Sequence, residues 1–171
     1  MINILKKGFT LIELLIVIAI IAILTALLTT NLQAARERAR DSRRKTDMQA
    51  INQSLRLYYS DRQTFPGSGS GIINGCGAAG VTACPWNSAF SNSTTTYMGN
   101  LPLDPSSTTT VPKYYFYHMV PGGNNFILLT TLENLSDADI ALSQSRCAIP
   151  YASAITGYTK DPTKDYVVCA E

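Results

Sequence analysis

The chain has 171 residues, a formal net charge of +2 and 46% hydrophobic residues. That length allows one modest hydrophobic core. A single histidine, together with four cysteines that show no CxxC spacing, argues against a zinc site. The sequence contains no Ser-x-Gly nucleophile elbow and no Gly-rich phosphate loop, so nothing indicates an enzyme.

Residues 9–28 form an apolar segment in which Glu13 is the one charged residue. As a helix this segment is about 30 Å long, which is enough to cross the hydrocarbon core of a bilayer. A carboxylate inside such a span costs about 2.5–3.5 kcal/mol. We therefore expect Glu13 to have a function and to need a partner.

Three interpretations of this segment compete. It is a plain membrane anchor, or a secretory signal peptide whose charged n-region is Lys6 and Lys7, or a helix kept after cleavage between Gly8 and Phe9. The apolar run exceeds the usual h-region of about 7–15 residues. Residues 29–34 (TTNLQA) also fit a small-x-small cleavage site poorly. Both observations argue against the signal peptide.

Residues 6–15, KKGFTLIELL, resemble the class III leader of type IV pilins and type II secretion pseudopilins. The resemblance implies that a membrane aspartyl protease cuts after Gly8 and then N-methylates Phe9. It also implies that Glu13 is the assembly carboxylate and that the two lysines are the positive charges of the leader.

The proposed cut would place two opposite charges near each other on one helix. It creates an α-amine on Phe9 whose ordinary pKa of about 7.7–8.0 leaves it mostly charged at neutral pH. Glu13 lies about 6 Å further along the helix. A neighbouring copy shifted along the axis would bring its own amine opposite Glu13, and the pair would offset the cost of each charge in lipid.

A single helix is predicted to continue far beyond the apolar segment. No proline or glycine occurs between Phe9 and the Phe65-Pro66-Gly67 stop, so about 50 residues lack a helix breaker. An apolar stripe at spacings of three and four is suited to cover a sheet; it consists of Met48, Ile51, Leu55 and Tyr58. The predicted organisation is a leader (1–8), a transmembrane and polymerisation half of the helix (9–30), an amphipathic half (31–64) and a small globular head (65–171).

Positive charge is concentrated on the second half of this helix. Seven basic residues stand against three acidic ones in 36–56, namely Arg36, Arg38, Arg40, Arg43, Arg44, Lys45 and Arg56. Two pairs at i and i+4 are expected, Asp41 with Lys45 and Arg43 with Asp47. We favour a solvated, salt-bridged helix face; a contact inside a filament and nucleic-acid binding are the alternatives.

The four cysteines indicate an oxidising compartment. They permit three pairings, of which we favour Cys76–Cys84 and Cys147–Cys169, because each would tie a loop rich in small polar residues. Simple charge counting conflicts with this, since six basic residues at 36–45 outnumber Lys6 and Lys7 and would place the following chain in the cytoplasm. We give the cysteines and the leader more weight and expect an extracytoplasmic head.

The head begins with a long irregular stretch, residues 66–113. Two strand-like runs follow at 114–120 and 126–132, joined by the turn residues 121–125 (PGGNN), and a third short run lies at 166–169. The only histidine, His118, falls inside the first run and is expected to be structural or on the surface. The predicted fold class is α+β and pilin-like: one long helix packed on a small antiparallel sheet with disulfide-tied loops.

Three acids after the second strand-like run form a weak calcium candidate. Glu133, Asp137 and Asp139 lie close together in sequence, and oxygen-rich loops suit Ca²⁺. Solvated loops often contain such acids, and no ligand pattern of the family aligns here. No other cofactor is expected.

The resemblance implies a structural subunit of a type IV pilus or type II secretion-like pseudopilus. Its partners would be copies of itself, related pilins, the prepilin peptidase/methyltransferase, membrane lipid, and an assembly platform with its ATPase. The chain would cross the bacterial inner membrane once, with a cytoplasmic N-terminus, before entering a filament in the periplasm or at the cell surface. The alternative is a monomeric single-pass protein with an extracytoplasmic ligand-binding head. The sequence does not separate major pilins, minor pilins and secretion or DNA-uptake pseudopilins.

Overall fold

The computed structural model describes residues 8–152 and 155–170, without the side chains of residues 27–31. The chain divides into two units that meet between Glu37 and Arg38, and each is described by itself. One helix, α1 (Leu11–Arg62), contributes residues to both units. Its 52 residues match the single long helix predicted from the lack of proline and glycine.

Helix α1 ends three residues before the predicted stop at Phe65. Gln63 takes a left-handed backbone conformation (φ 56°), and its N–H donates to the carbonyl of Tyr59 at 2.7 Å. A residue in this conformation ends a helix by satisfying one of its last free carbonyls. The apolar stripe from Met48 to Tyr58 is buried, as predicted, and forms part of the core of the second unit.

Three small antiparallel sheets make up the strands of the head. The first contains β1 (Gly67–Gly69), β2 (Ile72–Cys76) and β3 (Thr82–Cys84); the second contains β4 (Phe90–Ser91) and β5 (Thr96–Met98). Residues 66–113, predicted to be irregular, therefore contain five short strands. Their glycines and polar residues hide the alternation that marks a strand. Gly75 also lets β2 approach the aromatic core closely, since a Cβ there would lie 2.8 Å from the Phe90 ring.

The third sheet has the order β6 (Phe116–Met119), β7 (Phe126–Thr131) and β8 (Asp165–Cys169). These strands confirm the three predicted runs, and the β6–β7 hairpin turns over residues 121–125. In the central strand β7, Leu128 lies opposite Tyr117 of β6 and opposite Val168 of β8.

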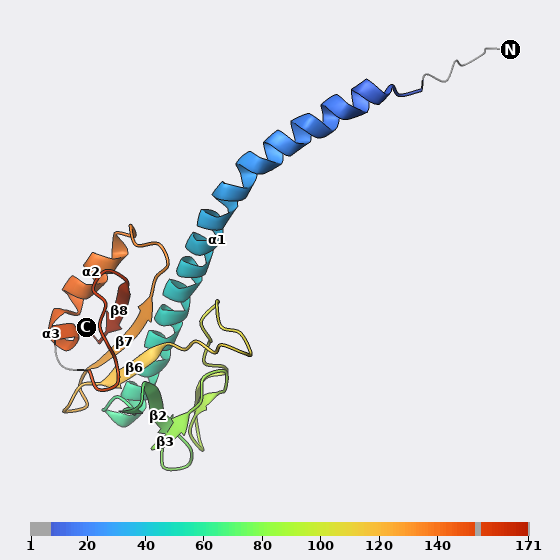
Figure 1. Ribbon diagram of the computed structural model, residues 1–171. Helices are drawn as coiled ribbons and strands as arrows, with labels where there is room; N and C mark the ends of the chain where they lie inside the picture. The colour runs from blue at the N-terminus through green and yellow to red at the C-terminus, as the bar shows by residue number, and fades with distance from the viewer. Residues whose placement is uncertain (1–7, 153–154, 171) are drawn as a thin grey trace. The chain divides into compact units, whose positions relative to one another are not determined.

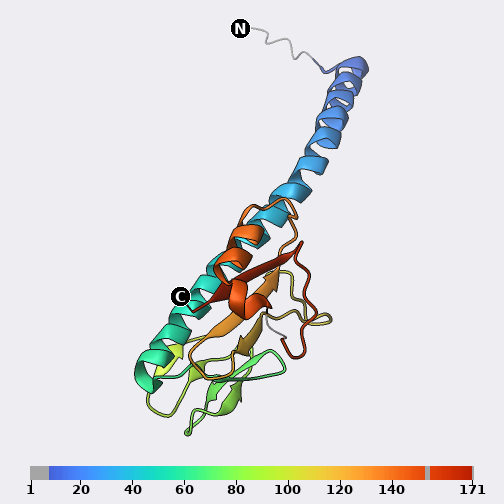
Figure 2. The same cartoon turned by 90° about the vertical axis from the view of Figure 1, so that its left-hand side faces the viewer.

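Both faces of this third sheet are covered, as Figures 1 and 2 show. Phe126, Leu128 and Val168 pack with the stripe of α1. On the other face Ile127 and Leu129 pack with Cys147 and Ile155. Two helices not predicted from the sequence, α2 (Asp139–Arg146) and α3 (Ala148–Ala152), lie between β7 and β8 in the chain. Burial on both faces explains why β7 begins with four consecutive apolar residues and why Tyr166 to Cys169 of β8 are a continuous run without charge.

Candidate functional site

The residues at the predicted cleavage point are accessible. Gly8 is exposed and precedes helix α1, and no heavy atom lies within 4 Å of the position that a Cβ would take there. The Phe9 side chain is 86% exposed. No other part of the described chain therefore covers this peptide bond. Lys6 and Lys7, the predicted leader charges, lie outside the described residues.

Glu13 takes part in a capping box at the start of α1. Its Oε2 accepts hydrogen bonds from the N–H and the hydroxyl of Thr10, both at 2.8 Å, and its own N–H donates to Thr10 Oγ1 at 3.3 Å. This reciprocal arrangement satisfies two N–H groups that the first turn leaves without partners. The pattern Thr-x-x-Glu before an apolar run was visible in the sequence and marks such a cap. Sequence reasoning had given Glu13 only an assembly role.

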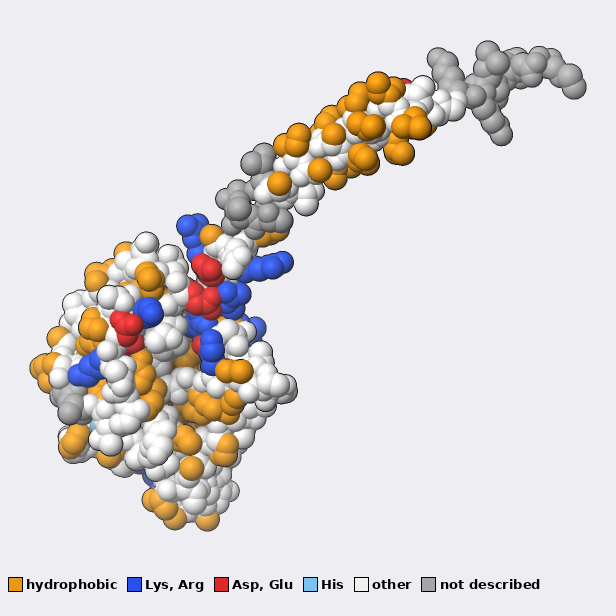
Figure 3. Space-filling view, in the orientation of Figure 1, with side chains coloured by type: hydrophobic (Ala, Val, Ile, Leu, Met, Phe, Trp, Pro, Cys, Tyr) orange, Lys and Arg blue, Asp and Glu red, His pale blue; other side chains and the backbone are white. Residues whose placement is uncertain are grey.

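The surface of α1 after this cap is apolar (Figure 3). From Leu11 to Leu24 every large hydrophobic side chain is 47–82% exposed. Among the residues that the structure describes, no helix meets both the length and the apolarity needed to cross a membrane. The predicted span, residues 9–30, includes positions whose side chains are not described.

An ion-pair cluster lies within the second unit, where α1 meets two loops of the head. It consists of Arg40, Asp41, Arg44, Asp104 and Glu133. Figure 3 shows basic and acidic side chains gathered along this part of the helix. At its centre the Arg44 side chain is only 3% exposed.

Arg44 holds the loop before β6 through a two-pronged contact. Its Nε donates to Asp104 Oδ2 at 2.7 Å and its Nη2 to Asp104 Oδ1 at 3.0 Å. Asp104 also accepts from the N–H of Ser106 at 2.8 Å and from its hydroxyl at 2.6 Å. A planar guanidinium matches a carboxylate in this way, whereas a lysine offers only a point charge.

The same helix turn also holds the loop after β7. Asp41 accepts from Arg44 Nη1 at 2.6 Å and from the N–H groups of Glu133 and Asn134, the latter at 2.8 Å. Glu133 in turn accepts from both Arg40 and Arg44, with 2.8 Å between Arg44 Nη2 and Glu133 Oε1. The cluster therefore joins one helix turn to two loops that are distant in sequence.

The cluster keeps its members charged. Burial alone would lower the pKa of Arg44, but its hydrogen bonds to Asp104, Glu133 and Asp41 outweigh that effect and raise the pKa. Burial raises the pKa of Asp104, yet the hydrogen bonds from Arg44 and Ser106 leave it below its ordinary value. For Glu133 the hydrogen bond from Arg40 has the largest effect, and the pKa falls to about 2 despite partial burial.

The structure gives no support to the weak calcium candidate, because all three of its carboxylates are paired with basic side chains. Glu133 belongs to the ion-pair cluster, and Lys45 Nζ lies 2.7 Å from both Asp137 Oδ2 and Asp139 Oδ2. In the described residues no group of three or more acidic, histidine or cysteine side chains is placed to hold a metal ion.

The interpretation of the basic run as a solvated face is therefore only partly correct. The predicted pair Asp41–Lys45 does not form, since Asp41 pairs with Arg44 and Lys45 pairs with Asp137 and Asp139 at the start of α2. The other predicted pair, Arg43 with Asp47, is present at 3.9 Å, and the Arg43 side chain is 71% exposed. The interpretation holds for Arg43 and fails for Arg44.

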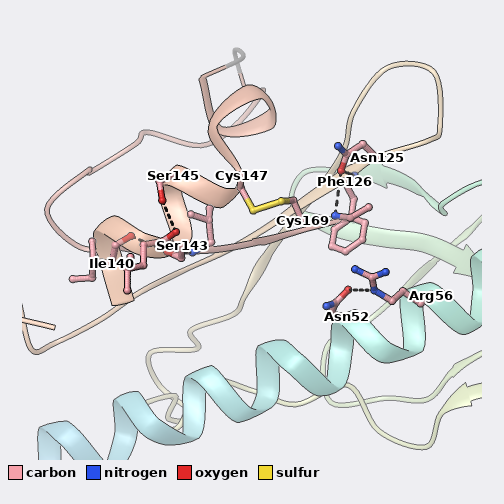
Figure 4. Close-up of a disulfide and its surroundings, with 12 residues drawn as sticks. Asn52, Arg56, Asn125, Phe126, Ile140, Ser143, Ser145, Cys147 and Cys169 are labelled. Atoms are coloured by element: carbon pink, nitrogen blue, oxygen red, sulfur yellow. Dashed lines mark hydrogen bonds between the residues drawn. A yellow bond between two sulfur atoms is a disulfide. The ribbon is translucent and has the colours of Figure 1, made fainter. Parts of the chain in front are cut away.

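The disulfides link Cys76 to Cys84 and Cys147 to Cys169, the two pairs favoured from the sequence. The first bridge joins β2 to β3. The second joins the C-terminal end of α2 to the end of β8 (Figure 4). Each therefore fastens two neighbouring segments of the head to one another.

The head also contains an aromatic cavity of about 540 Å³. Trp86, Tyr114, Phe116 and Tyr158 line it, and no charged residue does. Trp86 is half-buried and packs edge-to-face on Tyr115, with 5.9 Å between ring centroids. His118 is half-buried within β6, which agrees with a structural role.

Comparison with known proteins identifies one part of this chain. Residues 5–29 match the family model described as the prokaryotic N-terminal methylation motif. No curated protein and no solved structure matches the chain. The matched segment contains the exposed Gly8–Phe9 bond and the capping box of Glu13. The chain therefore carries the leader of type IV pilin-like prepilins, an assignment that rests on residues 5–29 and agrees with the long helix, antiparallel sheets and two disulfides of the fold.

Proposed function

We propose that this chain is a structural subunit of a type IV pilus or type II secretion-like pseudopilus, and not an enzyme. The prepilin peptidase would cut between Gly8 and Phe9 and methylate Phe9, and the mature chain would polymerise through the first half of α1. The observation that carries this proposal is the methylation motif at residues 5–29. Its partners would be further copies, related pilins, and the assembly platform with its ATPase.

The chemistry of the N-terminal helix supports this mechanism. The exposed apolar side chains from Leu11 to Leu24 would lie in lipid first and then pack against like helices. The α-amine that cleavage creates on Phe9 would pair with Glu13 of a neighbouring copy. Because the same surface meets a different surface on the next copy, such contacts produce open filaments instead of closed rings.

The first experiment measures the mass of the membrane-extracted chain from a bacterium that has a prepilin peptidase. The proposal expects loss of residues 1–8 and a gain of about 14 Da for one methyl group. Gly8→Val should block cleavage without disturbing the fold, since a Cβ at this position has no neighbour within 4 Å. Gly99→Val is the matched control, because Gly99 is equally open and lies outside the motif. An intact Met1 in the parent chain would refute the proposal.

The second experiment separates the charge of Glu13 from its capping role. Glu13→Gln removes the charge but keeps a side chain that can complete a capping box. Thr10→Val removes the hydroxyl of the box but keeps the charge. If Glu13 pairs with an amine during assembly, filaments seen by electron microscopy should disappear with Glu13→Gln and persist with Thr10→Val. The reverse result would assign the importance of Glu13 to the cap.

The aromatic cavity favours a second candidate, a single-pass anchored protein with a ligand-binding head. Apolar pockets of about 300–1,000 Å³ are typical of small-molecule sites, and this cavity of about 540 Å³ falls in that range. The mass measurement discriminates the two candidates, because an anchor would keep residues 1–8.

A further inference from the structure

A second, polar pocket of about 210 Å³ lies at the end of β8. Three elements form it: α1 through Asn52 and Arg56, the end of α2 through Arg146, and β8 through Cys169. The Cys147–Cys169 disulfide fixes α2 to the strand here, with 5.8 Å between the two Cα atoms. Figure 4 shows Asn52 and Arg56 on α1 beside the strand end that carries Cys169.

The charge of this pocket has one sign. Arg56 and Arg146 both line it and no carboxylate does; the other polar residues in the lining are Gln49, Asn52 and Tyr166, which are uncharged. Asn52 Oδ1 accepts from Arg56 Nε at 3.2 Å and so orients that guanidinium. Arginine forms two-pronged hydrogen bonds with carboxylates, so an anionic group of this kind complements the pocket.

The strand beside the arginines offers main-chain groups as well. Residues 165, 167 and 169 of β8 point their N–H and C=O groups away from β7, because residues 164, 166, 168 and 170 face it. Side chains of α2 use the first of these groups: Gln144 donates to the Asp165 carbonyl at 2.8 Å, and the Val167 N–H donates to Ser143 Oγ at 3.2 Å. Helix α2 ends at Arg146. Cys169, the next outward-facing residue, lines the pocket instead.

We propose that this pocket binds an acidic peptide segment in an extended conformation. Its carboxylate would lie between Arg56 and Arg146, and its main chain would hydrogen-bond to Cys169 at the open edge of β8. Peptides commonly bind in this way, with main-chain bonds to a sheet edge and a side chain in an adjacent pocket. A water occupies about 30 Å³, so the pocket of about 210 Å³ holds several waters. One acidic side chain fits in this space and would displace them.

The test titrates hexaglutamate into the full-length chain in neutral detergent micelles by calorimetry, with hexaglutamine and inorganic phosphate as parallel probes. Hexaglutamate should bind more tightly than either. Arg56→Gln and Arg146→Gln should each weaken it about fivefold or more, and the double variant should abolish it. Arg38→Gln is the matched control: it removes the same charge from an exposed position of α1 outside the pocket and should stay within about twofold. In ¹⁵N spectra the Cys169 amide should shift with hexaglutamate.

Four results would overturn the proposal. If hexaglutamate does not bind, there is no acidic-peptide site in this pocket. If hexaglutamine binds equally well, the arginines do not recognise the charge of the peptide. Phosphate binding as tight as that of hexaglutamate reduces the pocket to a general oxyanion site. An equal loss with Arg38→Gln would show diffuse charge attraction. None of these results depends on cleavage or polymerisation, so they leave the proposed function untouched.

Discussion

Replacing Arg44 with methionine tests how the helix holds the loops of the head. Methionine keeps much of the length of the side chain but removes five N–H donors and the charge. In the folded chain it would leave Asp41 and Asp104, which are 2% and 8% exposed, without their shared cation. Glu133 would keep Arg40 as a partner.

The expected loss of stability is about 3–5 kcal/mol, the cost of removing one partner from a buried ion pair. Asp104 loses two hydrogen bonds, at 2.7 and 3.0 Å, and keeps only those from Ser106. Asp41 keeps the hydrogen bonds from the N–H groups of Glu133 and Asn134. Because of these remaining donors, the expected loss does not exceed this range. For a domain of this size each kcal/mol lowers the melting temperature by about 2–4 °C, so a drop of about 6–20 °C is expected.

The assay is urea unfolding of the full-length chain in detergent, followed by near-ultraviolet circular dichroism. Arg43→Met provides the matched control, since Arg43 is 71% exposed and its nearest carboxylate is 3.9 Å away; it should cost less than about 0.5 kcal/mol. The double variant Arg44→Met with Asp104→Leu should lose less stability than the two single variants lose together, because Asp104→Leu removes the carboxylate that Arg44→Met leaves buried without a cation. A loss with Arg44→Met no larger than with Arg43→Met would refute the role given to the cluster.

Three further predictions concern the head. The pKa of Glu133 is about 2 in the folded chain against an ordinary 4.5. Ionised Glu133 therefore contributes about 1–2 kcal/mol to the free energy of unfolding above pH 4.5, and this contribution is lost as the pH falls toward 2. The melting temperature should fall less steeply with acid in Glu133→Gln than in the parent chain. Tyr158→Phe removes a 2.7 Å hydrogen bond to the fully buried Asp165 and should cost about 1.5–3 kcal/mol in urea unfolding. Replacing Cys147 and Cys169 by alanine opens a bridge of sequence separation 22 and should cost about 3 kcal/mol in the same assay.

Each of these predictions has a control. Asp139→Asn, on a side chain that is 50% exposed, should change the acid titration little, and a Glu133→Gln profile identical to that of the parent chain would contradict the pH assignment. Tyr114→Phe alters an exposed tyrosine and should be neutral. Opening Cys76–Cys84, of sequence separation 8, should cost about 1 kcal/mol less than opening the other bridge if loop entropy dominates; the opposite order would contradict that account.

The elements predicted correctly from the sequence are those that depend on local periodicity. The stripe Met48, Ile51, Leu55 and Tyr58 repeats with the helical period and is buried. The strands β6, β7 and β8 are short runs of β-branched and aromatic residues and were placed within a few residues. The cysteine pairs join residues 8 and 22 positions apart, each closing a loop within the head.

The features that were missed depend on contacts between distant residues. Arg44 meets Asp104 across 60 residues, whereas the i+4 rule considers only neighbours on the same helix. Helix α2 was missed because it is 8 residues long and only Ile140 and Ser143 are buried on it, a signal too short for a periodicity argument.

The ion-pair cluster also changes how the basic run should be interpreted. Of the six basic residues at 36–45, Arg40, Arg44 and Lys45 bind carboxylates of the head. Nucleic-acid binding uses cations that are available to phosphates, and these three already have carboxylate partners. The other three of the six, Arg36, Arg38 and Arg43, are exposed, and Arg43 lies 3.9 Å from Asp47 of its own helix. Much of the positive charge on α1 is therefore explained by the two acidic loops that the helix holds. Any affinity of the chain for DNA should fall with Arg38→Gln and stay unchanged with Lys45→Gln.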